Sequence, residues 1–221
     1  MESASRLNYW LGLRSRPQTE SPHVVWIWSF FGSFLGISLI QIVFGQAKYF
    51  IKRGAPSIVA SYGGTAVLVY GVVHSPPAQP RPVLGGHFLS ALTGICITNL
   101  FRLLPTEERF QNMLWLAGSL ACAISIVVMQ ATGTTHPPAG NFNKWRSIGA
   151  TAFLAVVNPE IREMGWYYLA VILLTSALTL VIAIINNNIQ RRYPSFWFRP
   201  NQSVDFKPAP IPISFSGVVG R

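Results

Sequence analysis

The stretch 166-WYYLAVILLTSALTLVIAII-185 decides the fold class, because it runs from Trp166 to Ile185 without one charged side chain. As an α-helix it would be about 30 Å long, at about 1.5 Å per residue, which matches the hydrocarbon core of a bilayer. A buried helix of a soluble protein would show a polar stripe, whereas this stretch is apolar all round. It therefore predicts a helix that spans a membrane.

Similar uncharged runs cover Val24–Phe44, Val83–Leu100 and Met113–Ala131, and a slightly shorter one covers Ser57–Val73. Half of the chain is hydrophobic and only 11% is charged, against about 25% in an ordinary soluble domain. The sequence predicts an all-α fold, a polytopic transmembrane bundle of about five spans. We expect a multi-pass integral membrane protein, with the lipid bilayer as a partner and one membrane domain over residues 24–193. An N-terminal tail (1–23) precedes it, and a Pro-rich C-terminal tail (194–221) follows.

The net charge of +10 lies almost entirely outside the apolar runs. It can therefore face lipid phosphate, and no basic motif of a nucleic-acid module accompanies it. We predict no nucleic-acid partner. Arg191 and Arg192, with Tyr193 and the aromatic residues that follow, are expected at the membrane interface, and residues 166–168 at the opposite interface. Lys and Arg counts leave open whether the two termini share one side of the membrane.

The first polar interruption is "HSPPAQPRP", His74–Pro82. Its prolines leave backbone carbonyls without partners, and Pro82 stands where a helix can begin. The free N–H groups of that first turn, next to Arg81, predict an anion site. The alternative is a surface turn whose arginine meets lipid phosphate.

The second interruption is "THPPAG", Thr135–Gly140, and "GATAFLAVV", 149–157, follows a polar insert. Nine residues reach only about 14 Å as a helix, about half of the hydrocarbon core. A half-helix after irregular backbone is typical of transporters with broken helices. The alternative is a helix that lies on the membrane surface. "GGTAVL" (63–68) and "GATAFL" (149–154) match at four of six positions, which hints at a pseudo-symmetric pore.

Small residues at four-residue spacing, Gly32 with Gly36 and Gly86 with Ser90 and Gly94, allow close approach of helices. They fit packing within the bundle, and they also predict a homo-oligomer as a partner. His87 alone in an apolar run fits a hydrogen bond between helices. No ligand-spaced cluster, nucleophile set or intramembrane carboxylate pair occurs, so we predict no metal, no cofactor and no enzymatic activity.

These motifs resemble the HPP family of integral membrane proteins, named for the His-Pro-Pro that stands here at 136–138. The resemblance covers about 24–194 and includes "SYGGTAVLVYG" (61–71), "SPPAQPRPVLGGHFLSALTG" (75–94) and "HPPAG" (136–140). The ending "NNNIQRRYPSFWF" is similar to that of fungal members. The resemblance implies a transporter, because plant and cyanobacterial members have been linked to nitrite transport.

The residues favour a small anion over a cation, since the intramembrane polar groups are helix N-termini, histidine and arginine. We expect transport of a small inorganic anion, with nitrite as the first candidate, and His136 could also relay a proton. The alternatives are a membrane scaffold or regulatory subunit without transport activity, and an anion channel. The predicted substrate-binding residues are His136, Pro137, Pro138, Gly140, Thr151, Gln79, Arg81, Thr65 and His87.

The segment 141-NFNKWRSIG-149 departs from the family pattern, in which His-Pro-Pro-Ala-Gly runs almost directly into Ala-Ser/Thr-Ala. Without it, the chain would read "HPPAGATAFLAVV". Either the segment is a basic hairpin, or the gene model keeps a piece of intron. We favour the second explanation, because Lys144, Trp145 and Arg146 would need burial or an exit route.

Overall fold

The computed structural model describes residues 21–136 and 150–198, and no strand occurs among them. The prediction of an all-helical membrane bundle is confirmed. The long helices are α2 (Pro22–Gln46), α5 (Pro80–Phe101), α7 (Leu114–Thr132) and α10 (Tyr167–Asn187). The short elements are α3 (Lys48–Ile51), α4 (Ser61–Ala66), the π-helix η1 (Val67–Gly71), the 3-10 turn η2 (Pro76–Ala78), α6 (Glu107–Asn112), α8 (Ala150–Val157) and α9 (Pro159–Met164).

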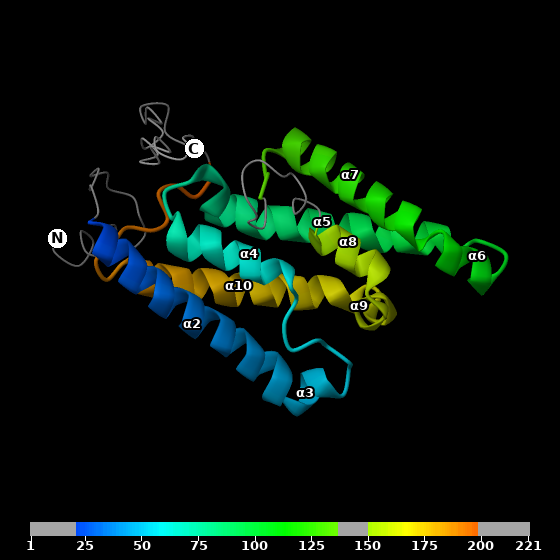
Figure 1. Cartoon of the computed structure of the whole chain (residues 1–221), viewed down its shortest axis with the longest axis horizontal. Coiled ribbons are helices and arrows are strands. Elements are labelled where there is room, and N and C mark those ends of the chain that lie inside the picture. The colour runs from blue at the N-terminus through cyan, green and yellow to red at the C-terminus, as the bar shows by residue number, and fades with distance from the viewer. Residues whose placement is uncertain (1–20, 137–149, 199–221) are drawn as a thin grey trace, which may run out of the picture.

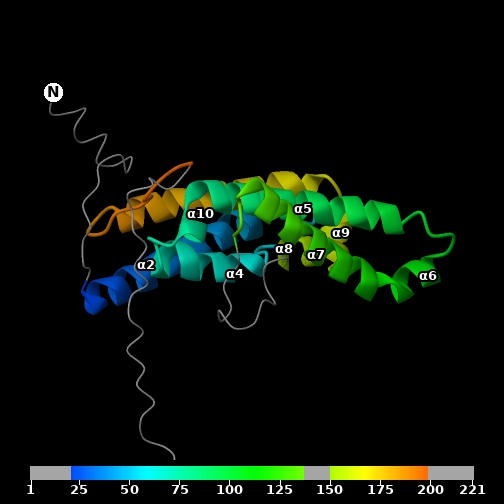
Figure 2. The same cartoon turned by 90° about the horizontal axis from the view of Figure 1, so that it is seen from above.

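The four long helices are long and apolar enough to cross a membrane. α10 packs against both α2 and α5, and α5 packs against α7, so that α5 and α10 form the centre of the bundle (Figures 1 and 2). Large apolar side chains on the outer faces are exposed, among them Trp26 (65%), Phe30 (66%) and Trp115 (66%). In a protein with this composition, such faces contact lipid.

Two short helical segments complete the bundle. α4 and η1 form one helical segment, 61–71, that follows irregular chain containing Pro56, so Ser57–Val73 is not helical over its first four residues. Its helical part reaches about 16 Å, half of the hydrocarbon core. α8 packs between α5 and α7 and is the half-helix that the sequence predicted. The two half-helices begin next to each other, with Thr151 Oγ1 3.1 Å from Ser61 Oγ.

Each half-helix runs toward a different end of the bundle. We call the end with Pro22, Pro80, Thr132 and Asn187 end A, and the opposite end, with Gln46, Phe101, Leu114 and Tyr167, end B. α4 and η1 run toward end A, where Asn187 Nδ2 donates to Val69 O (2.8 Å). α8 runs toward end B, where Thr98 Oγ1 donates to Ala155 O (3.2 Å). α2 starts and α10 ends at end A, so the first and last long helices have their outer ends on the same side of the bundle (Figure 1).

The small residues predicted to bring helices together contact other segments of the same chain. A Cβ at Gly36 would lie 2.1 Å from the Tyr70 hydroxyl, and one at Gly86 would lie 2.8 Å from Cβ of His136. One at Gly94 would lie 2.5 Å from the carbonyl oxygen of Ala152. The faces that predicted a homo-oligomer are therefore occupied by the chain's own half-helices and by the segment after α7.

Replacement of Gly94 by alanine is expected to lower the thermal stability of the purified protein in detergent. The added methyl group meets backbone of α8, which cannot move aside as a flexible side chain can, and overpacking of this kind costs about 1 to 3 kcal/mol. In a chain of this size, each kcal/mol corresponds to about 2 to 4 °C in Tm. Gly63→Ala is the matched control, because no atom lies within 4 Å of its added Cβ. Equal melting temperatures for both variants would show that α8 does not pack as described.

The end of α10 corrects one expectation. Arg191 is 2% exposed and Tyr193 is 0% exposed, so their side chains point into the protein and not toward lipid headgroups. Arg191 Nη1 donates to Tyr70 O (2.7 Å), a carbonyl of the last turn of η1 that has no helical partner. Tyr168, expected in the opposite aromatic belt, is also fully buried. Polar side chains are drawn inward here because the half-helix ends leave backbone groups to be paired.

Candidate functional site

Four of the sequence-predicted residues meet at the centre of the bundle. Thr65 Oγ1 lies 2.8 Å from Nε2 of His87 and 3.0 Å from Nε2 of His136. Nδ1 of His87 lies 2.9 Å from Thr151 Oγ1. All four side chains are 2% exposed or less. We call these four residues the histidine centre.

Each residue of the histidine centre lies near the start or the end of a helix. Thr151 lies in the first turn of α8 and Thr65 in the second turn of α4, and His87 follows the first turn of α5, which contains Pro80 and Pro82. α7 ends at Thr132 and is capped by Gly133, whose φ of 62° is the left-handed conformation that glycine adopts freely. The chain then turns inward, so that Nδ1 of His136 lies 2.6 Å from the carbonyl oxygen of Pro77.

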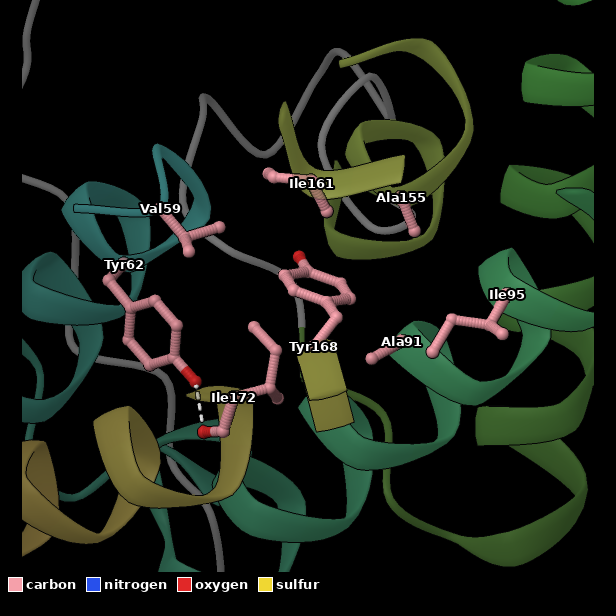
Figure 3. Packing of buried hydrophobic residues seen from close by; sticks show 8 residues of the cluster. All are labelled: Val59, Tyr62, Ala91, Ile95, Ala155, Ile161, Tyr168 and Ile172. Atoms are coloured by element: carbon pink, nitrogen blue, oxygen red, sulfur yellow. Dashed lines mark hydrogen bonds between the residues drawn. The ribbon is translucent and has the colours of Figure 1, made fainter. Parts of the chain in front are cut away.

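Tyr62 holds the His87 ring from the side. The two rings are stacked, with centroids 4.3 Å apart and planes 12° apart. The Tyr62 hydroxyl donates to Ile172 O (2.8 Å) and contacts Ser176 Oγ (2.6 Å) on α10. Figure 3 shows the apolar cluster around Tyr62, in which side chains of α4, α5, α8, α9 and α10 pack together. The members are Val59, Tyr62, Ala91, Ile95, Ala155, Ile161, Tyr168 and Ile172.

The contacts of His136 fix part of the hydrogen positions. A carbonyl oxygen only accepts, so Nδ1 of His136 donates to Pro77. Thr65 has one hydroxyl hydrogen and lies between two Nε2 atoms. Where it donates to one of them, the other must donate to it. The Thr65 hydroxyl also lies 3.3 Å from the carbonyl oxygen of Ser61, which can only accept.

The contact of His87 Nδ1 with Thr151 determines how many ring nitrogens of the two histidines carry hydrogen. Thr151 Oγ1 lies 3.1 Å from Ser61 Oγ, and either hydroxyl can donate to the other; where Thr151 donates, Nδ1 of His87 must donate to Thr151. Three of the four ring nitrogens then carry hydrogen, and the two imidazoles together hold one positive charge. Where Ser61 donates to Thr151 instead, the same contacts are satisfied with both imidazoles neutral. The histidine centre can thus hold two proton states that differ by one proton.

In the part of the chain that the structure describes, the surroundings of the centre contain a helix start and no carboxylate. α8 begins at Ala150, next to Thr151, and the N-terminus of a helix carries a partial positive charge. Within the described residues, the acidic side chains all lie in α6 or α9 and are exposed. They are Glu107, Glu108, Glu160 and Glu163. No carboxylate among them offsets the positive potential at the centre.

Gln79 and Arg81, both predicted to bind substrate, lie away from the centre. The Gln79 side chain is fully buried and accepts a hydrogen bond from the backbone N of Ser195 (2.8 Å). Arg81 donates to Thr132 O (2.7 Å) and Phe198 O (3.1 Å). Both residues therefore tie the start of α5 to the segment after α10, at end A.

Tyr193 belongs to the same set of contacts at end A. Its hydroxyl donates to Ala78 O (2.6 Å). Burial, with a smaller contribution from Tyr70, raises the pKa of Tyr193 well above its usual range. The phenol therefore stays a neutral donor over the physiological pH range.

A family model described as "HPP, transmembrane region" matches residues 18–194. The chain belongs to the HPP family. Two transmembrane proteins of Dictyostelium discoideum are similar to this HPP protein. One is 33% identical over 193 residues, which cover 86% of this chain and 62% of that protein. The other is 33% identical over 174 residues, which cover 77% of this chain and 50% of that protein. The chain thus spans less than two thirds of either relative, and no solved structure matches it.

Pro137, Pro138 and Gly140 of the HPP motif lie outside the described residues, as does the segment 141–149. Of that motif, His136 is the residue that the structure places, and it lies in the histidine centre. Sequence reasoning missed Ser61 and Tyr62, which contact the centre. Both precede the "GGTAVL" echo directly, and polar residues at the start of a half-helix are the signal that could have found them.

Proposed function

We propose that this HPP protein transports a small inorganic anion across the membrane, with nitrite as the first candidate substrate. The observation that carries the proposal is the histidine centre itself, a buried set of hydroxyl and imidazole donors next to the start of α8. Hydrogen-bond donors and helix N-termini bind anions, and transporters place such sites where broken helices meet. The resemblance to nitrite-linked members supports nitrite in particular.

The proton states of the centre support an anion as well. A charge buried in the membrane is costly unless an opposite charge accompanies it. A proton taken up by the histidine centre would supply that charge when the anion enters. Hydroxyl and imidazole donors around one oxygen-bearing monovalent anion would replace the hydrogen bonds that it makes to water.

Uptake of nitrite into liposomes that carry the purified protein tests the proposal. We expect saturable uptake above that of protein-free liposomes, at a pH where nitrous acid is too scarce to carry the flux. His136→Ala should lose this uptake, because the variant breaks the contacts to Thr65 and Pro77. Arg53→Ala is the control, since Arg53 is exposed and its guanidinium lies over the rings of Tyr49 and Tyr167, away from the centre.

Two results would contradict the proposal. Wild-type liposomes that take up nitrite, nitrate and chloride no faster than protein-free liposomes would exclude small-anion transport. Uptake that is unaltered in His136→Ala would separate transport from the histidine centre.

A further inference from the structure

The two halves of the chain contain the same elements in the same order. Residues 22–101 contain a long helix, a half-helix and a long helix (α2, α4 with η1, α5), and residues 114–187 repeat this order (α7, α8, α10). Corresponding elements end 86 residues apart. The pairs of last residues are Gln46 and Thr132, Gly71 and Val157, and Phe101 and Asn187. This spacing counts the segment 141–149, whereas the order of the elements and their contacts do not depend on it.

The amino acids agree with this pairing at the same spacing. Ser90–Thr93 in α5 and Ser176–Thr179 in α10 both read Ser-Ala-Leu-Thr, 86 residues apart. The echo of 63–68 in 149–154 has the same separation and pairs Thr65 with Thr151. These two threonines bind opposite nitrogens of the His87 ring.

Packing within each half is also equivalent. Gly32 in α2 and Gly118 in α7 are 86 residues apart, and each admits the half-helix of its own half. A Cβ at Gly32 would lie 2.6 Å from the Tyr70 ring, and one at Gly118 would lie 2.9 Å from the Phe153 ring. Each half makes three passes between end A and end B, so the second half is inverted relative to the first. Inverted repeats around a central site are the architecture of many secondary transporters.

Each end of the bundle is closed in the same way. At end A, the segment 188–198 covers the loop 72–79, with Tyr193 donating to Ala78 O and Ser195 N donating to Gln79. At end B, the segment 102–112 covers the loop 158–165. Arg102 Nη2 donates to Arg162 O (3.2 Å), and the Arg162 guanidinium lies 5.2 Å from the centre of the Phe110 ring. Segments and loops at the two ends are again 86 residues apart.

The histidine centre is closed from both directions. Between it and end B lies the cluster of Figure 3, around Tyr62 and Tyr168. Toward end A lies a second apolar cluster, which includes Tyr70, Val73 and Tyr193. The structure therefore shows an occluded centre between two equivalent covers.

From these observations we propose that the chain is an alternating-access carrier built from two inverted halves. The proposal rests on the proposed transport function and names its mechanism. The cover of 188–198 over 72–79 opens the centre to end A, and the cover of 102–112 over 158–165 opens it to end B. The two covers open in turn, because the half-helices that they hold meet at one hydrogen-bonded centre. An anion channel, by contrast, would let both ends connect at once.

Accessibility of the centre from each face, with one cover weakened at a time, tests the proposal. The reporter is Ser61→Cys, in a background with Cys96→Ala and Cys122→Ala, and the probe is an anionic, membrane-impermeant methanethiosulfonate. Tyr193→Phe weakens the end A cover by removing the bond to Ala78, and Phe110→Ala weakens the end B cover. Probe is added to one face at a time, in vesicles of both orientations.

We expect Tyr193→Phe to raise the labelling rate from end A about fivefold, the shift that one lost hydrogen bond produces in a two-state equilibrium, and to lower the rate from end B. Phe110→Ala should produce the opposite pattern. The carrier proposal is overturned if a weakened cover raises labelling from its own end without lowering it from the other, or if no variant changes labelling. Nitrite uptake by wild-type vesicles separates the two claims, since its absence would overturn the proposed function, whereas uptake with uncoupled labelling would overturn the carrier mechanism alone.

Discussion

His87→Ala is expected to reduce nitrite uptake about a hundredfold, which together with the loss expected for His136→Ala is the largest effect of a single substitution in this chain. The His87 ring bonds both half-helices, through Thr65 at Nε2 and Thr151 at Nδ1. Its loss removes two buried hydrogen bonds to a site that should bind charge, each worth about 1.5 kcal/mol, and about 1.4 kcal/mol corresponds to a tenfold change. Initial rates of uptake into proteoliposomes, normalised to inserted protein, measure the effect.

His23→Ala is the matched control for this variant. His23 is an exposed histidine in the first turn of α2, and its ring packs edge-on against Trp26, with ring centroids 5.2 Å apart. We expect it to retain most of the uptake rate. A His87→Ala protein that elutes as wild type from a size-exclusion column and still transports at more than a tenth of the wild-type rate would contradict the assignment of the centre.

Thr65→Val is expected to have the second largest effect, while Thr65→Ser should retain most of the activity. Valine has nearly the shape of threonine but cannot stand between two imidazole nitrogens as donor and acceptor, whereas serine keeps the hydroxyl. Both Nε2 atoms would lose their partner in the valine variant, so we expect uptake to fall at least tenfold, with a cost of about 1 to 3 kcal/mol for each buried polar group left unpaired. Comparison of the two variants in uptake and in Tm separates the hydroxyl from the packing.

Thr93→Val provides the control for a threonine of the same bundle. Its hydroxyl donates to Leu89 O within α5 and contacts no residue of the centre. We expect uptake near the wild-type rate. Equal losses in Thr65→Val and Thr65→Ser would show that the methyl group, and not the hydroxyl, matters at this position.

Much of the centre could be predicted from the sequence. Polar residues that interrupt or enter apolar runs are costly in a membrane unless they serve packing or a site, which marked Thr65, His87, His136 and Thr151. Their meeting follows from the lengths of the segments, since half-helices that begin after irregular chain must begin inside the bilayer. Nitrite and anion transport remain predictions that the uptake measurements test.

Other parts could not be predicted, because sequence position does not give the direction of a side chain. The sequence predicted a helix start at Pro82 directly after Arg81, which indicated an anion site, but α5 begins at Pro80 and the Arg81 guanidinium turns toward Thr132 and Phe198 at end A. Arg191 was expected at the interface, and it is buried because η1 ends with unpaired carbonyls, which no local pattern announces. The sequence repeats between the two halves in two short stretches, 63–68 with 149–154 and 90–93 with 176–179, which are too short to define the halves without the matching ends of the helices.

The most direct measurement of the central claim is the ¹⁵N spectrum of imidazole-labelled protein in the presence and absence of nitrite. The chain has four histidines, and single substitutions assign their signals. We predict that nitrite shifts the ring nitrogens of His87 and His136 together, in a saturable manner, and leaves those of the exposed His23 and His74 in place. Signals of His87 and His136 that stay unchanged at concentrations where the same protein transports nitrite would contradict the account.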